Sequence, residues 1–153
     1  MLKGKLIHPV ILGVLGMAGH GSKILIADGN FPAATKLGSN AVLVNLNLMP
    51  GIISCTDILE AIVSAVPIES AAVMETLKEG PYAIKDDPPI WEEFNMILCG
   101  AGLPNDKKLE QVERQAFYNM ALASDVCLTI QSGDQRIYAN LLLTIGVVMP
   151  PKS

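Results

Sequence analysis

The sequence predicts an α/β protein with three layers, α/β/α, around a largely parallel or mixed central sheet. Half of the 153 residues are hydrophobic but only 5% are aromatic, so the apolar excess consists of Ala, Val, Ile, Leu and Met, which fill buried strands and packed helices. Helical and extended patterns alternate along the chain, without an internal repeat or a linker. Because this length suits one domain, we expect residues 1–153 to form a single domain.

The first elements are a helix and a buried strand, with a glycine loop between them. Pro9 suits the first turn of a helix that runs to about Ala18, and Gly19-His20-Gly21 ends this helix. The wholly apolar run 24–27 predicts a strand that is buried on both faces. Asp28-Gly29-Asn30 has turn chemistry. Its aspartate therefore marks the carboxyl end of a central strand.

The middle of the chain predicts a strand, a helix, another strand and a loop. The second strand covers about 41–46. Ser54–Asp57 has the spacing of a capping box, which predicts a helix that begins there and ends at Pro67. A short strand follows at 71–74. The polar, proline-containing stretch 79–89 is a loop whose length suggests a lid or a subunit contact.

The last third predicts two helices and two strands. Apolar residues at helical spacing cover 90–98, and glycines end that helix. A second apolar stripe covers 112–121, where Arg114 and Tyr118 lie one turn apart on another face and are free to serve a site. Extended patterns predict the final strands, at 126–130 and 138–148.

Composition excludes several classes of function. The net charge is -4 and the basic residues are scattered, so no basic stripe exists for nucleic acid. No apolar run approaches the ~18 residues that a membrane span needs, and we expect a soluble, cytoplasmic protein without membrane partners. Cys55, Cys99 and Cys127 are far apart among apolar neighbours, which predicts small buried side chains. The mean hydropathy of +0.40 predicts that part of the surface meets other subunits.

Familiar catalytic and cofactor motifs are missing from the sequence. It contains no G-x-x-x-x-G-K-[ST], H-E-x-x-H or G-x-S-x-G pattern. Gly13, Gly16 and Gly19 precede the first strand, whereas a dinucleotide fingerprint follows one. We therefore expect no metal site and no nucleotide cofactor.

Four polar side chains are candidates for a site, and each has a structural alternative. His20 lies just before the strand that delivers Asp28, although a lone histidine is more often structural. Asp28 lies after a strand, where open sheets bind ligands. A purely structural role in the turn is an equal alternative for this residue. Tyr138 and Asn140 would project from one side of the predicted strand. If they are buried they need partners, either a sugar or neighbouring backbone.

Short motifs spread over nearly the whole chain carry a resemblance to a known family. Between about Lys3 and Val148 they are, in order, Gly19-His20-Gly21, Asp28 with Asn30-Phe31-Pro32, Val73-Met74-Glu75, Val112-Glu113-Arg114 with Phe117-Tyr118, Gly133-Asp134, and Tyr138-Ala139-Asn140. Each motif alone is weak, but the ordered set resembles the L-fucose mutarotase and D-ribose pyranase family. The stretch 81–91 and the Phe-Tyr helix are more similar to the fucose branch.

The resemblance implies a three-layer α/β subunit, assembly into ring-shaped decamers, and interconversion of sugar anomers without a cofactor. It makes His20 the proton donor. The sugar-binding residues that it implies are Asp28, Glu69, Met74, Tyr118, Tyr138 and Asn140. Glu69 stands where fucose enzymes tend to carry Asp. Ala139 stands where many fucose enzymes have Gly, and the resulting Tyr-Ala-Asn sequence is typical of the ribose branch.

These residue types suit the chemistry of ring opening. The reaction removes a proton from the anomeric hydroxyl and delivers one to the ring oxygen, and an imidazole with a pKa of about 6.5 can serve both steps. We expect Asp28 either to hold the protonated His20 or to bind a hydroxyl. We therefore predict an isomerase, an aldose mutarotase for L-fucose or a related sugar. The alternatives are a D-ribose pyranase, a non-catalytic sugar-binding transport accessory protein, and a structural oligomerisation module.

Overall fold

The computed structural model describes residues 1–107 and 109–153 and is built on one six-stranded mixed sheet, with the order β2-β5-β1-β6-β3-β4. The strands are β1 (Lys23–Ala27), β2 (Val42–Asn45), β3 (Ile68–Met74), β4 (Glu110–Val112), β5 (Val126–Gln131) and β6 (Leu141–Ile145). β6 is antiparallel to both of its neighbours, β1 and β3, whereas the other neighbouring pairs are parallel. Consequently β1 and β3 run in the same direction and end at the same edge of the sheet.

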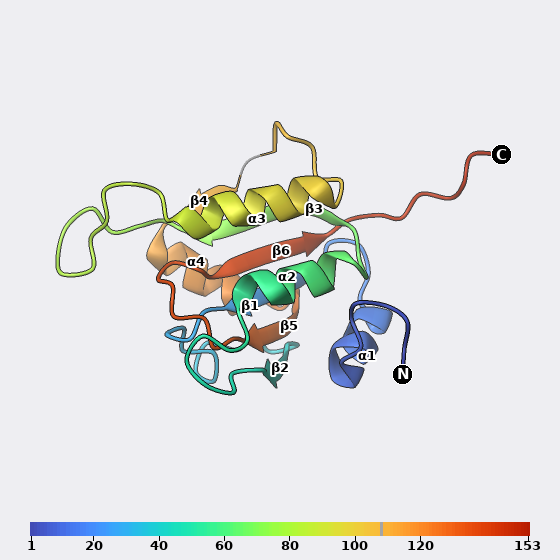
Figure 1. Cartoon of the computed structure of the whole chain (residues 1–153), viewed down its shortest axis with the longest axis horizontal. Coiled ribbons are helices and arrows are strands. Elements are labelled where there is room, and N and C mark those ends of the chain that lie inside the picture. Colours follow the sequence, from blue (N-terminus) through green and yellow to red (C-terminus); the bar gives the residue numbers. More distant parts are fainter. Residues whose placement is uncertain (108) are drawn as a thin grey trace.

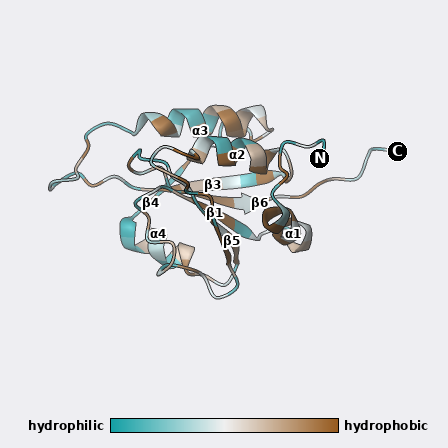
Figure 2. Cartoon of the chain, turned by 60° about the horizontal axis from the view of Figure 1, so that its bottom comes forward, coloured by the Kyte–Doolittle hydropathy of each residue, from teal (hydrophilic) through white to brown (hydrophobic). Residues whose placement is uncertain are grey.

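Helices cover both faces of this sheet. They are α1 (Pro9–Met17), α2 (Cys55–Val63), α3 (Pro89–Gly100) and α4 (Arg114–Ala121). α2 and α3 lie side by side over one face, and α4 lies against the other (Figure 1, Figure 2). α1 packs near β2 and β5, on the side of the molecule from which the C-terminal tail leaves (Figure 1). The predicted three-layer α/β class with a mixed sheet is confirmed.

Two apolar cores hold the layers together. Ile26 faces the larger core with Leu59 and Phe94, and Leu25 faces the smaller core with Phe117; all are fully buried. Adjacent residues of β1 reach opposite cores because side chains alternate along a strand. This arrangement confirms that β1 is buried on both faces, as its continuous apolar run predicted.

The capping box predicted at the start of α2 is present. The Ser54 hydroxyl accepts the Asp57 N–H at 3.1 Å, and the Asp57 carboxylate accepts the Ser54 N–H at 3.3 Å. Both groups satisfy donors that would otherwise lack partners at the helix start. Asp57 therefore needs no role in a site.

Two sequence-based boundaries are wrong. Val112 does not belong to a helix: it ends β4, where it pairs with Met74, and α4 begins at Arg114. Its burial in the smaller core explains why it fitted the apolar stripe. The last strand begins at Leu141, and Tyr138 has a φ of +57°, which places it in a turn before β6.

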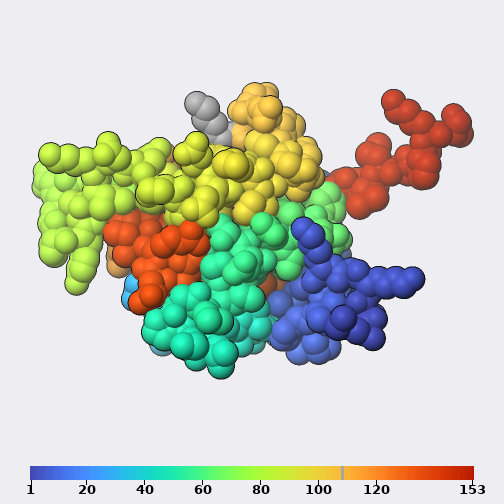
Figure 3. Space-filling view, viewed as in Figure 1, coloured from blue at the N-terminus to red at the C-terminus, as the bar shows by residue number. Residues whose placement is uncertain are grey.

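Two segments project from the body at opposite ends. The loop 75–88, between β3 and α3, forms a lobe, and the C-terminal residues leave from the other end (Figure 3). Within the described residues, the structure contains no helix with the length and apolarity that a membrane crossing requires.

We expect Ser54→Ala to lower the free energy of unfolding by about 1 kcal/mol, because the Asp57 N–H in the first turn of α2 loses its acceptor. Urea denaturation followed by circular dichroism measures the change. Ser39→Ala, at an exposed position, is the matched control and should leave stability within about 0.5 kcal/mol of the parent. Equal stability of the two variants would show that the cap contributes nothing.

Candidate functional site

Most of the predicted site residues line one cavity at the edge where β1 and β3 end. Its volume is about 340 Å³, which lies in the range of small-molecule sites. The predicted residues in its wall are Asp28, Met74, Tyr118, Tyr138 and Asn140, and the wall is completed by Asn30, Phe31, Tyr82, Arg114 and Ile137. Asp28 follows β1, Met74 ends β3 and Asn140 precedes β6, so the strand order alone brings these residues together.

Asp28 combines both roles that its sequence allowed. Its Oδ1 accepts the Asn30 N–H at 2.9 Å, which forms the expected turn, and its Oδ2 accepts the Ala139 N–H at 3.3 Å. Desolvation by burial raises the pKa of Asp28, and these backbone donors offset part of that effect. A carboxylate can accept further hydrogen bonds. Asp28 can therefore receive a ligand hydroxyl as well.

Asn140 is fixed by Asp28 and keeps a free amide. Its Oδ1 accepts the Asp28 N–H at 2.8 Å. Its Nδ2 has no hydrogen-bond partner in the described part of the chain, although the residue is 5% exposed. The amide therefore offers donors to a ligand in the cavity.

The hydroxyl of Tyr138 is already committed to backbone groups. It accepts the Leu77 N–H at 3.0 Å and donates to the Tyr82 carbonyl at 3.2 Å. The Tyr138 carbonyl accepts the Trp91 indole N–H at 2.9 Å. Tyr138 thus presents its ring to the cavity while its polar atoms hold the loop 75–88 and α3 in place.

Tyr118 forms an aromatic wall flanked by cations. Its ring lies 5.6 Å from that of Phe31, and the Lys36 ammonium and the Arg114 guanidinium lie 5.4 and 5.5 Å from its centroid. Arg114 reaches the cavity from the first turn of α4. Its separation from the apolar stripe of the helix was the sequence signal for this position.

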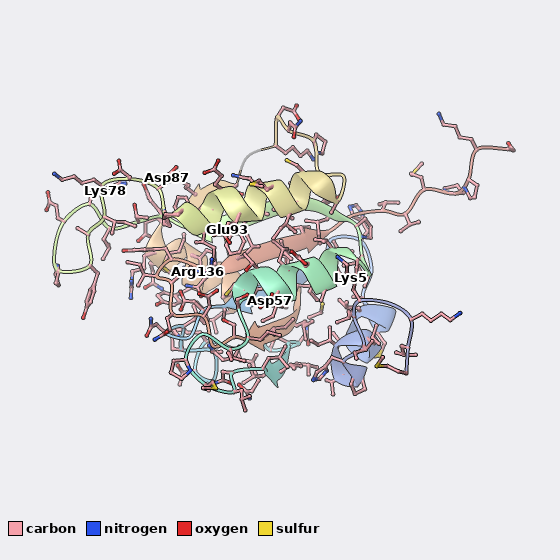
Figure 4. The ribbon with its side chains drawn as sticks, viewed as in Figure 1. Lys5, Asp57, Lys78, Asp87, Glu93 and Arg136 are labelled. Atoms are coloured by element: carbon pink, nitrogen blue, oxygen red, sulfur yellow. The ribbon has the colours of Figure 1, made fainter. Side chains whose placement is uncertain are left out.

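A second buried carboxylate, Asp134, holds the segment between β5 and β6. Burial opposes its ionisation, but the hydrogen bonds and charge of Arg136 and the N–H of Cys55 outweigh this and lower the pKa of Asp134. Arg136 also reaches Glu93 at 3.1 Å, which ties the segment to α3 (Figure 4). These contacts fix the backbone that leads to Tyr138 and Asn140.

His20 and Glu69 do not lie in the cavity. Their side chains pair at the opposite edge of the sheet, where His20 Nε2 is 2.8 Å from Glu69 Oε2 and the two are 57% and 40% exposed. β1 alone, five residues long, separates His20 from Asp28 by about 13 Å. The expected contact between Asp28 and a protonated His20 is therefore wrong for two residues of the same chain, because β1 keeps them apart.

The end of β6 positions this pair. The Ile145 carbonyl accepts the Gly21 N–H at 2.9 Å, and the Gly146 N–H donates to the Pro67 carbonyl at 2.9 Å. Gly21 has a φ of +84°, a conformation that favours glycine. The segments that carry His20 and Glu69 are thus both bonded to one strand end.

Sequence reasoning missed Tyr82 and Ile137, which reach the cavity from a loop and a turn. Loop positions depend on tertiary contacts and leave no periodic pattern in the sequence. No group of three or more His, Cys, Asp or Glu side chains in the described residues could hold a metal ion.

Comparisons with known proteins identify the family of this chain. The model of the RbsD / FucU transport protein family matches residues 1–148. This chain belongs to that family. A fucose mutarotase of Danio rerio is 31% identical and the match covers 98% of this chain and 96% of that protein. The crystal structure of FucU from Bifidobacterium longum has a TM-score of 0.78 and 34% identity, over 95% of this chain and 97% of that one.

A second structural relative contains a sugar. The fucose mutarotase of Streptococcus pneumoniae in complex with L-fucose has a TM-score of 0.77 and 26% identity, over 94% of this chain and 95% of that one. The family resemblance predicted from the ordered motifs is therefore confirmed.

We expect Arg136→Gln to lower the free energy of unfolding by about 2 kcal/mol at neutral pH, because the buried Asp134 loses charged hydrogen bonds. The folded-state pKa of Asp134 is lowered, so this stabilisation is complete above the unfolded pKa near 3.9 and declines as the pH falls through the folded pKa. Chemical denaturation between pH 8 and 3 should show a constant difference that shrinks only below about pH 4. Lys85→Gln, on the exposed loop, is the control.

Proposed function

We propose that this chain is a monosaccharide mutarotase that interconverts the α and β anomers of L-fucose or a related aldose by opening and closing the sugar ring. One observation carries the proposal: Asp28, Met74, Tyr118, Tyr138 and Asn140 share one cavity of about 340 Å³. The named activity of its relatives supports the same reaction.

The cavity suits a neutral polyol. The Asp28 carboxylate can accept hydrogen bonds from sugar hydroxyl groups, while the Asn140 amide and the Arg114 guanidinium can donate to hydroxyl oxygens. The Tyr118 ring can pack against the C–H face of a sugar. Polar groups at fixed positions on an apolar wall are typical of small-molecule sites.

Proton transfer needs an acid/base group, and the His20–Glu69 pair, which lies outside the cavity wall, can supply one. When Nε2 of His20 donates to Glu69, Nδ1 carries a lone pair and can take the proton of the anomeric hydroxyl. The imidazolium then returns a proton to the ring oxygen as the bond from the anomeric carbon to that oxygen breaks. The product is an open-chain aldehyde, and the imidazole is neutral again. Glu69 stabilises the imidazolium between the two transfers.

Since the pair and the cavity lie at opposite edges of one chain, we propose that His20 and Glu69 of one copy complete the cavity of another. A contact between opposite edges is heterologous, and such contacts close into rings or extend into filaments. A ring agrees with the decamer that the family resemblance implies. Val147 and Met149, which follow β6 near the His20 edge, are exposed apolar side chains that suit a subunit contact.

We expect His20→Ala to abolish catalysed anomer exchange of L-fucose, because no other imidazole replaces it in the site. Saturation-transfer NMR measures the exchange. His8→Asn is the matched control, since His8 accepts the Ile11 N–H at the start of α1 and Asn can do the same. Full exchange by the His20 variant would remove this residue from the mechanism.

Shared sites predict recovery of activity on mixing. His20→Ala and Asp28→Asn should each be nearly inactive alone. After unfolding and joint refolding at equal amounts, random assembly pairs an intact cavity with an intact histidine at roughly a quarter of the sites, so roughly a quarter of the parental exchange rate should return. Mixed oligomers, shown by mass spectrometry, without recovered exchange would contradict a site shared between copies.

A D-ribose pyranase is the second candidate, favoured by the Tyr138-Ala139-Asn140 sequence that is typical of the ribose branch. It uses the same ring opening but recloses to a furanose. Exchange rates measured on L-fucose and D-ribose separate the two activities. Sugar binding without faster exchange would instead indicate a transport accessory protein.

A further inference from the structure

The cavity is polar at its base and apolar along one side of its mouth, while the exposed Asn30 and Arg114 belong to the rest of the wall. Asp28 and Asn140 at the base are 3% and 5% exposed. Tyr82 and Ile137, which line the same cavity, are 71% and 46% exposed. Binding of a ligand over large exposed apolar side chains is favourable because it removes apolar surface from water.

Tyr138 assembles this mouth from two distant segments. Its hydroxyl donates to the Tyr82 carbonyl and accepts the Leu77 N–H, while Ile137 is its neighbour in the chain. The loop is closed further by the Ile84 N–H, which donates to the Leu77 carbonyl at 3.0 Å. Tyr82 therefore stands beside the cavity although its loop projects from the body (Figure 1, Figure 3).

The proposed reaction fixes which part of the sugar meets the mouth. The ring oxygen and the anomeric carbon must face outward to reach His20 of another copy, so the remaining ring hydroxyls face Asp28 and Asn140. In an aldopyranose the carbon that follows the ring oxygen carries the terminal group. That terminal group therefore also lies at the mouth, where Tyr82 and Ile137 are the exposed apolar side chains of the wall.

We propose that Tyr82 and Ile137 form an apolar lip that binds the terminal methyl group of a 6-deoxyaldose and disfavours a hydroxymethyl group there. The inference rests on the proposed function and names the part of the chain that sets its substrate preference. A hydroxyl placed against the lip loses water without gaining a hydrogen bond, whereas a methyl group fills the same contact.

Three sugars that share ring stereochemistry test the lip: L-fucose has a methyl group, L-galactose a hydroxymethyl group, and D-arabinose no sixth carbon. We expect the parent protein to exchange L-fucose with a kcat/KM about 10-fold above that for L-galactose. Tyr82→Ala should lower kcat/KM for L-fucose about 10-fold while leaving D-arabinose within about 2-fold, because only the former sugar loses a contact. Tyr82→Phe keeps the ring and should behave as the parent.

Lys85→Ala, on the same loop but outside the cavity wall, is the matched control. An equal loss on L-fucose and D-arabinose in Tyr82→Ala would mean that the variant damages the loop in general, and would overturn the lip. A parent protein that exchanges none of the sugars would refute the proposed function itself. Parental exchange with an unchanged sugar preference in Tyr82→Ala would refute the lip alone.

Discussion

The antiparallel insertion of β6 between β1 and β3 is the constraint on which both parts of the proposed site depend. At its start, the Asn140 side chain accepts the Asp28 N–H and joins the carboxyl end of β1 to the cavity. At its end, the Ile145 carbonyl and the Gly146 N–H hold the segments that carry His20 and Glu69. One five-residue strand thus positions groups at opposite edges of the sheet, and its rigidity keeps them apart.

Two buried carboxylates near the cavity have opposite pKa shifts, for physical reasons that match their surroundings. Desolvation by burial is the largest influence on Asp28, whose hydrogen-bond partners in the described residues are backbone and amide groups, and it raises the pKa of this carboxyl group. Asp134 meets the Arg136 guanidinium, whose hydrogen bonds and charge overcome desolvation and lower its pKa. Asp134 thus serves as a fixed anion that anchors a loop, while Asp28 remains available to a ligand.

Exposed apolar side chains on the C-terminal tail are consistent with the proposed contact between copies. Val148 is 79% exposed and Met149 75% exposed on a tail that leaves the body beside the His20 edge. Among the described residues they are left exposed, and the proposed contact with another copy would remove them from water. The same contact would bring an imidazole to a cavity that contains none in its wall.

The sequence by itself determined the fold class, the buried strand 24–27, the capped helix after Ser54, and the ordered motifs that place the chain in its family. These depend on local periodicity and short-range hydrogen bonds, which a sequence carries directly. Tertiary structure decided that His20 lies far from Asp28, that the Tyr138 hydroxyl binds backbone, and that Tyr82 reaches the cavity. Strand order and direction set these distances, and contacts between residues remote in sequence leave no local pattern.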